Sequence, residues 1–264
     1  MDITQTTADL AAEHEALDEV LSSLEEASWG VATSSPGWTV ADQVGHLAYY
    51  DQAATTAIVA PDAFAAMRDE MFSGATSIKA VDDRTLEPYR RMSGAALLQA
   101  WRDHRKALLA AVSGLSNDDR VEWYGPSMSS RSFATARLME AWTHGRDVLD
   151  ALDLRVAPTD RLWHIARLGF ITRDWSYRNR RLEPPSTPAY VGLDAPSGRR
   201  WEFGDPAAVD RVDGDAEDFC LVVTQRRHLD DTDLSATPGA RDWLVVAQAF
   251  AGPATTGPAP RTRT

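Results

Sequence analysis

Apolar residues recur every three or four positions through the first two thirds of the chain, which is the spacing of amphipathic helices. Near the N-terminus, Leu10, Leu17 and Leu21 share one helix face. Thr39 is placed to cap a later helix, with Asp42 as the second member of a capping-box-like pair. The pattern predicts helices over residues 4–27, 40–59, 62–72, 93–113, 132–152 and 159–182.

The pattern changes after Pro184 and Pro185, which are typical of a boundary. Residues 189–193 and 200–203 alternate as two short strands around a turn, and residues 215–227 are expected to form a helix. Residues 243–247 fit a strand or a helix, because periodicity does not separate the two in so short an apolar run.

These patterns predict an α-helical domain followed by a small α+β domain. We expect the helical domain to cover residues 1–183 and the α+β domain to cover residues 184–252. The last segment, 253–264, consists mainly of Gly, Pro, Thr and Arg, so we expect it to be disordered.

Composition and charge narrow the classes of partner. The chain has 264 residues and a net charge of −12, which disfavours binding to the phosphate backbone of nucleic acids. No apolar run approaches the roughly 20 residues that span a bilayer, and the N-terminus does not resemble a secretory signal. We therefore expect a cytoplasmic protein that does not bind membranes; the sequence leaves open whether it is a monomer or a homodimer.

The strongest chemical signal lies in the helix expected over residues 132–152. Glu140 and His144 are four residues apart, about 40° from each other on a helical wheel, so both side chains can reach one metal ion. Asp147 lies on the same stripe and could orient His144 or complete the ligand shell. The apolar residues of this helix cluster on a different face. Such a pair also occurs by chance, so spacing alone leaves the metal site a hypothesis.

A third ligand would have to come from another helix, and His46 is the best candidate. It lies beside the apolar face that Val40, Val44 and Leu47 define in the helix over residues 40–59. A side chain on that flank can point into a cavity between helices. The alternative is that His46 has a structural role, as a lone histidine on a helix usually does.

Three parts of the sequence resemble the DinB-like family, in particular its mycothiol-dependent maleylpyruvate isomerase branch of actinobacteria. They are SSPGWTVADQVGHLAYYD at 34–51, MEAWTHGRDVLDAL at 139–152, and VDGDAEDFCLVVTQRRHLDDTDL together with WLVVAQAFAG near the C-terminus. The resemblance covers about 250 residues. It implies a four-helix-type bundle followed by a small domain like a sterol-carrier protein, with zinc bound by His46, Glu140 and His144.

The resemblance also implies a chemistry. Two histidines and one carboxylate leave a zinc ion with an open position, where an external thiol, here mycothiol, could be held as a nucleophile. We therefore expect a thiol-dependent isomerase or S-transferase that acts on a small electrophile. Two alternatives remain open. One is a metal-dependent hydrolase with Asp147 or Asp51 as general base, and the other is a non-catalytic module that binds a metal or a small ligand. Another divalent metal, such as nickel, could replace zinc.

Residues of the predicted second domain add two expectations. Arg226 and Arg227 fit a solvated helix end, where cations suit the helix dipole. The alternative is that they bind a carboxylate-bearing ligand across the domain interface, as cofactor-binding or catalytic residues. Cys220, the single cysteine, lies in an apolar run, so we expect a buried and unreactive thiol.

Overall fold

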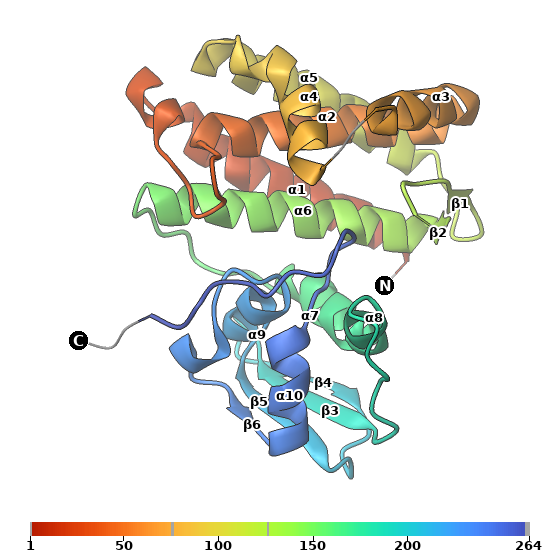
Figure 1. The fold of residues 1–264 in the computed structure, drawn as a ribbon, viewed down its shortest axis with the longest axis vertical. Coiled ribbons are helices and arrows are strands. Elements are labelled where there is room, and N and C mark those ends of the chain that lie inside the picture. Colours follow the sequence, from red (N-terminus) through yellow and green to blue (C-terminus); the bar gives the residue numbers. More distant parts are fainter. Residues whose placement is uncertain (1, 75–76, 126, 262–264) are drawn as a thin grey trace. The chain divides into compact units, whose positions relative to one another are not determined.

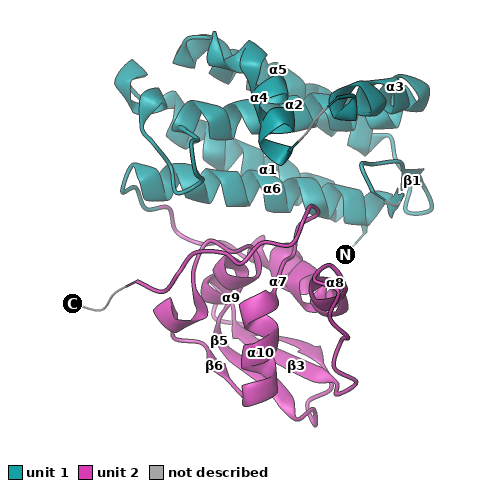
Figure 2. Ribbon diagram, in the orientation of Figure 1, with its two compact units in different colours: residues 1–155 teal, residues 156–264 magenta. Residues whose placement is uncertain are grey.

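The computed structural model describes residues 2–74, 77–125 and 127–261. Figure 1 shows a mostly helical chain with one small mixed sheet in its C-terminal part. The chain divides into two compact units, residues 1–155 and residues 156–264 (Figure 2). The predicted class, helices followed by a smaller α+β part, is confirmed at this level.

Four long helices form the first unit: α1 (Ile3–Ser22), α2 (Val40–Val59), α5 (Gly94–Ser113) and α6 (Ser130–Ala151). α2 packs against α5 and α6, while α1 packs against α6 and α5. Shorter elements complete the unit, namely η1 (Glu26–Gly30), α3 (Pro61–Phe72), α4 (Ile78–Arg90), β1 (Arg120–Val121) and β2 (Met128–Ser129). The apolar faces of the long helices meet in a core that includes Leu17, Val44, Leu97, Trp101 and Val148.

The start of α2 is set by its first residues, as the sequence predicted. The Thr39 side chain accepts a hydrogen bond from the Asp42 backbone nitrogen at 3.3 Å, and the Asp42 carboxylate accepts one from the Thr39 backbone nitrogen at 2.9 Å. This capping box satisfies backbone donors that the first turn would otherwise leave unpaired. It fixes where α2 begins and therefore which face of α2 carries His46.

Helix α4 was not predicted from the sequence. Its interior contains Pro88, which normally argues against a helix, and it buries only a narrow stripe of side chains. α4 packs closely on α2, because Gly45 of α2 has no side chain: a Cβ there would lie 3.0 Å from the Tyr89 Cβ and 3.4 Å from Leu86. The glycine lets α4 approach α2 beside His46.

The second unit is a four-stranded sheet with five helical segments. The strands are β3 (Ala189–Asp194), β4 (Arg200–Gly204), β5 (Asp210–Asp215) and β6 (Ser235–Ala236), in the order β4-β3-β5-β6. Only β3 and β5 pair in parallel; the other pairs are antiparallel. The helical segments are α7 (Leu162–Ile171), α8 (Arg173–Arg178), α9 (Ala216–Val223), η2 (Leu229–Asp231) and α10 (Pro238–Val246). α9 packs against β3 and β5, and α10 packs against β5.

The division between the units falls after residue 155, not at 183/184 where the sequence predicted it. Arg173 of α8 explains why α7 and α8 belong to the second unit. Its guanidinium donates to the Thr187 carbonyl oxygen at 2.7 Å and to the Asp210 carboxylate at 3.0 Å, which ties α8 to the start of β5. Pro184 and Pro185 lie in the loop between α8 and β3, inside the second unit.

Several segment boundaries also differ from the expected ones. The helix expected over 159–182 is two helices separated at Thr172, and the helix expected over 215–227 ends at Val223. Residues 243–246, left open between strand and helix, belong to α10. Residues 253–261 form no regular element, but Thr255 hydrogen bonds to Gln225 and Gln248; residues 262–264 lie outside the described part. Among the described residues, no helix is both long and apolar enough to cross a bilayer.

Candidate metal centre

The structure brings His46, Glu140 and His144 together on two helices of the first unit. α6 carries Glu140 and His144 one turn apart, and α2, which packs against α6, carries His46. The Glu140 Oε2 atom lies 3.1 Å from the His144 Nε2 atom and 3.4 Å from the His46 Nε2 atom. One ligand atom from each residue lies within 4.8 Å of the others. Within the described part of the chain, this is the one group of three such residues with that geometry.

All three side chains are largely covered but remain reachable from solvent. The exposed fraction of the side chain is 16% for His46, 24% for Glu140 and 10% for His144. A metal held by these three residues could therefore be reached by a small molecule from solvent. A centre that must bind a substrate or co-substrate needs such an opening, whereas a purely structural metal site is closed.

The electrostatics suit a cation. Burial, with a smaller effect of the neighbouring His144, lowers the pKa of His46 to about 4, so this imidazole is neutral at physiological pH and offers a lone pair. Burial tends to raise the pKa of Glu140, but the effect of the adjacent His144 and His46 side chains outweighs it and holds that pKa well below its usual value. Neutral imidazole nitrogens and a carboxylate oxygen are the donors that zinc and similar divalent ions take, so these residues fit the ion that the resemblance implies.

The residue that contacts the far side of His144 is Gln43, not the expected Asp147. The Gln43 Oε1 atom lies 2.6 Å from the His144 Nδ1 atom, while the nearest Asp147 carboxylate oxygen is 3.9 Å from the same nitrogen. That second distance is too long for a direct hydrogen bond. The sequence did not predict this role of Gln43. The packing of α2 against α6 decides which residue of α2 faces His144, and one sequence does not show that packing.

Aromatic rings surround the two histidines. The Trp38 ring, in the loop before α2, is centred 5.2 Å from the His46 ring and is stacked at 6.0 Å on the His144 ring. Tyr50, one turn after His46 on α2, is centred 4.5 Å from the His46 ring. These rings restrict the orientations of the imidazoles and give the centre an aromatic wall.

Asp51, one of the two candidate bases, belongs to a separate buried cluster. Its carboxylate accepts hydrogen bonds from Arg137 Nη2 at 2.9 Å and from Trp101 Nε1 at 3.1 Å, and His14 Nε2 lies 3.8 Å away. Asp51 and His14 have no exposed surface. We call Asp51, Arg137, Trp101 and His14 the buried cluster; its carboxylate already has a cationic partner.

A half-buried carboxylate on α4 is electrostatically linked to the centre. Burial and then the neighbouring Asp83 carboxylate raise the pKa of Asp82, whereas two nearby cationic side chains and, with the smallest effect, His144 lower it. Asp82 in turn contributes to a raised pKa of Tyr50, after the larger effect of burial. Sequence reasoning missed Asp82 because α4 itself was missed.

The remaining candidates lie in the second unit. Arg226 and Arg227 lie three and four residues after Val223, the last residue of α9, and both are half-buried. The Arg226 guanidinium donates to the Thr224 carbonyl oxygen at 2.9 Å. Cys220 is fully buried, and burial raises the pKa of its thiol well above the usual value, so the predicted buried thiol is confirmed.

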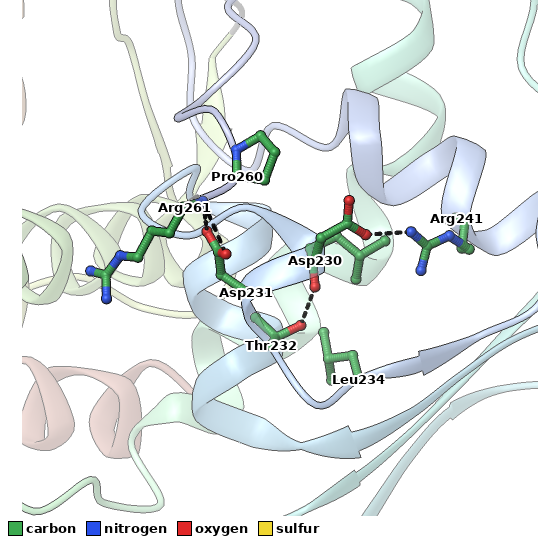
Figure 3. A pocket seen from close by; sticks show the side chains of 8 residues that line it. Asp230, Asp231, Thr232, Leu234, Arg241, Pro260 and Arg261 are labelled. Atoms are coloured by element: carbon green, nitrogen blue, oxygen red, sulfur yellow. Dashed lines mark hydrogen bonds and ion pairs between the residues drawn. The ribbon is translucent and has the colours of Figure 1, made fainter. Parts of the chain in front are cut away.

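The second unit also has a pocket, of about 400 Å³, beside η2 (Figure 3). Asp230 in its wall pairs with Arg241 at 2.5 Å, and the Asp231 carboxylate accepts a hydrogen bond from the Arg261 backbone nitrogen at 2.9 Å. Both carboxylates are therefore already engaged with groups of the chain itself, and the pocket carries no arrangement comparable to the three-residue centre.

Comparison with known proteins agrees with the resemblance inferred from the sequence. Residues 10–149 match the family described as mycothiol maleylpyruvate isomerase N-terminal domain. This match includes all three residues of the centre. Uncharacterized proteins from two strains of Mycobacterium tuberculosis are each 44% identical over 249 residues, which is 93% of this chain and 95% of theirs.

Two solved structures share the fold. The crystal structure of the mycothiol-dependent maleylpyruvate isomerase aligns with a TM-score of 0.58 and 18% identity. The structure of a histidine-to-alanine mutant of that isomerase aligns with a TM-score of 0.59 and 17% identity. Each alignment covers 90% of this chain and 94% of the isomerase, so the likeness extends over both parts of the chain.

Proposed function

The chain belongs to the mycothiol maleylpyruvate isomerase N-terminal domain family, and on that premise we propose that it is a zinc-binding, mycothiol-dependent isomerase or S-transferase. In this proposal His46, Glu140 and His144 hold the metal. The substrate is a small electrophile, such as an activated alkene or an epoxide. The first unit would be a DinB-like bundle and the second a domain like a sterol-carrier protein.

One observation carries the proposal: three donor atoms converge within 4.8 Å while their side chains stay partly accessible. When zinc is bound, it lowers the pKa of a thiol that reaches its open position and so makes a nucleophile available at neutral pH. The chain's own residues bind and orient. The two imidazoles and Glu140 supply lone pairs, and Trp38 and Tyr50 limit the directions from which a ligand can approach.

The sulfur has to come from outside the chain. Cys220 is the single cysteine, and its thiol is fully buried with a raised pKa, so it is not available as a nucleophile. Arg226 and Arg227 remain candidates for binding an anionic group of the thiol or of the electrophile. Replacing either by Ala should weaken ligand binding and leave the metal content unchanged.

Hydrolysis is the less supported alternative. A metal-dependent hydrolase usually needs a general base near the metal. Asp51 is held by Arg137 and Trp101, and Asp147 is 99% buried, so neither carboxylate is placed to accept a proton from water at the centre. A non-catalytic metal-binding role would predict metal without any response to thiols or substrates.

The metal ligands can be tested by substitution. We expect His46→Ala, Glu140→Ala and His144→Ala each to weaken zinc affinity by about 100-fold or more, because two protein ligands replace three. Elemental analysis of folded, dialysed protein measures this, and His104→Ala is the control, since His104 bonds to the Ala48 carbonyl oxygen and lies outside the centre. A variant with full metal content would exclude that residue as a ligand.

The thiol can be tested spectroscopically. Cobalt-substituted protein should develop a sulfur-to-metal charge-transfer band when mycothiol is added, and no such band with S-methylated mycothiol. A spectrum that does not respond to millimolar mycothiol would reject the thiol-dependent activity. Retained metal would then favour hydrolysis or simple binding, which a turnover assay without thiol separates.

A further inference from the structure

The loop before α2 is connected to the centre by a chain of hydrogen bonds through Gln43. This side chain is fully buried. Its Nε2 atom donates to the Thr33 hydroxyl at 2.9 Å and to the Ser35 hydroxyl at 3.0 Å, and its Oε1 atom lies 2.6 Å from the His144 Nδ1 atom. A buried amide with partners on both sides can hold only one orientation if those partners are themselves fixed.

The Thr33 hydroxyl is fixed in this way. It donates its single proton to the Trp38 carbonyl oxygen at 3.1 Å, so it can only accept from Gln43. The NH₂ group of Gln43 must therefore face Thr33, and the carbonyl oxygen must face His144. An amide oxygen has no proton to donate, so the proton between Gln43 and His144 belongs to His144 Nδ1.

This assignment has a consequence at the other ring nitrogen. An imidazole that binds a metal through Nε2 carries its one proton on Nδ1, so this assignment leaves the Nε2 lone pair of His144 for a metal. The Glu140 Oε2 atom, 3.1 Å away, is also an acceptor. Two lone pairs then face each other, and a cation between them would satisfy both.

We propose that Gln43 is a positioning residue that fixes His144 in the Nδ1–H tautomer, and that Thr33 and Ser35 fix Gln43 in turn. The tautomer follows from the hydrogen bonds alone, but its function rests on the proposed metal centre. The opposite tautomer would place an N–H bond where the metal has to bind. Outer hydrogen bonds of this kind orient histidine ligands and raise their basicity.

The first test removes the amide. Gln43→Leu should lower zinc affinity by about 10- to 100-fold, the usual cost of losing a partner behind a histidine ligand. Competition with a chromogenic chelator measures the affinity. Gln52→Leu is the matched control, because Gln52 is an exposed glutamine on the same helix. A folded Gln43→Leu protein with the affinity of the Gln52→Leu control would overturn the proposal.

The second test leaves Gln43 in place and removes what orients it. Thr33→Val combined with Ser35→Ala deletes both hydroxyl acceptors, so the amide can turn and offer its NH₂ group to His144. We expect weaker zinc binding although neither residue contacts His144, and Thr33→Ser alone should keep the wild-type affinity. If the double variant also kept that affinity, the role of the loop hydroxyls would be rejected.

The tautomer itself can be read by nitrogen-15 NMR at pH 8, without any assay of activity. Wild-type protein should show the His144 proton on Nδ1, and the Thr33→Val/Ser35→Ala variant should lose this preference. A proton on Nε2 in the metal-free wild type would overturn the inference whether or not a metal binds. A proton on Nδ1 in a wild type that binds no metal would instead reject the metal centre and leave the tautomer assignment standing.

Discussion

Two clusters of histidine and carboxylate share helices α2 and α6 and differ in how their charges are balanced; the buried cluster also takes His14 from α1 and Trp101 from α5. In the buried cluster, the Asp51 carboxylate of α2 is paired with the Arg137 guanidinium of α6, and the side chains are almost fully covered. In the metal centre, Glu140 of α6 faces two imidazoles and is 24% exposed. The residue types are similar, so type alone does not identify a metal ligand.

The difference lies in the source of the positive charge. Arg137 supplies it from within the chain at the buried cluster, which explains why Asp51 can be tolerated without exposed surface. At the metal centre, lone pairs from three residues converge, and the proposed ion would supply the charge. A histidine–carboxylate group is thus a candidate metal site when its acceptors converge on an accessible point, and a structural group when a cationic side chain already occupies that point.

The largest expected effect is on the buried cluster. Arg137→Met should reduce the free energy of unfolding by about 3–5 kcal/mol, because it leaves the Asp51 carboxylate buried without a cation. Adding Asp51→Asn should recover more than half of the loss, since the asparagine is uncharged and can still accept from Trp101. Urea denaturation of the metal-free proteins measures both changes.

The metal centre provides the contrast for that experiment. Glu140→Gln should change the unfolding free energy of the metal-free protein by less than about 1 kcal/mol. The reason is that water partly solvates the Glu140 carboxylate in the metal-free wild type, so its removal leaves no buried charge without a partner. If Glu140→Gln and Arg137→Met destabilised equally, the two clusters would not differ in the way described.

The next effect is a pH dependence of the buried cluster. Burial is the main cause that lowers the pKa of His14 from 6.5 to about 4, and the charge of Asp51 opposes it. Between these values the unfolded chain binds a proton that the folded chain does not. The stabilisation is therefore present above about pH 6.5 and is lost as the pH falls toward 4, up to about 3 kcal/mol.

Replacing His14 should remove this dependence. The unfolding free energy of His14→Leu should fall less steeply than that of the wild type between pH 6.5 and pH 4. Denaturation curves at several pH values in one buffer system measure the unfolding free energy of both proteins. For each protein, the change relative to its own value at pH 7.5 is then compared. Parallel slopes would show that His14 does not titrate as a buried group.

The sequence was sufficient for the elements and contacts that depend on local patterns. Thr39 and Asp42 gave the start of α2, and the four-residue spacing of Glu140 and His144 put both on one face of α6. These features depend on helical geometry within one segment. His46 was the best candidate for the third ligand from its place on the flank of a helix, and the family resemblance strengthened that assignment, because spacing cannot show which helices meet.

Contacts between segments could not be predicted from one sequence. Gln43 lies three residues before His46, and its contact with His144 depends on which turn of α2 packs against which turn of α6. The compact units divide after residue 155 and not at the predicted boundary at 183/184 for a similar reason: Pro184 is a strong local signal, but the hydrogen bonds of Arg173 join α8 to the second unit.

The smallest expected effect concerns two adjacent carboxylates on α4, Asp82 and Asp83. Asp82 is half-buried, and His144 has a small effect on its pKa, whereas Asp83 pairs with Lys79 and with Arg90. A dication at the centre should therefore be attracted by Asp82 more than by Asp83. We expect Asp82→Asn to weaken zinc affinity by about 3- to 10-fold, and Asp83→Asn to weaken it less, because solvent and paired cations screen its charge.

Chelator competition at low and high salt separates this electrostatic effect from a change in fold. Because Asp82 is half-buried, salt screens its attraction less than that of an exposed charge, so the difference between the two variants should persist in part at high salt. Equal affinities for Asp82→Asn and the wild type would show that Asp82 does not face the bound ion. A complete loss of metal in Asp82→Asn would be too large for a through-space effect of one half-buried charge and would contradict this account of Asp82.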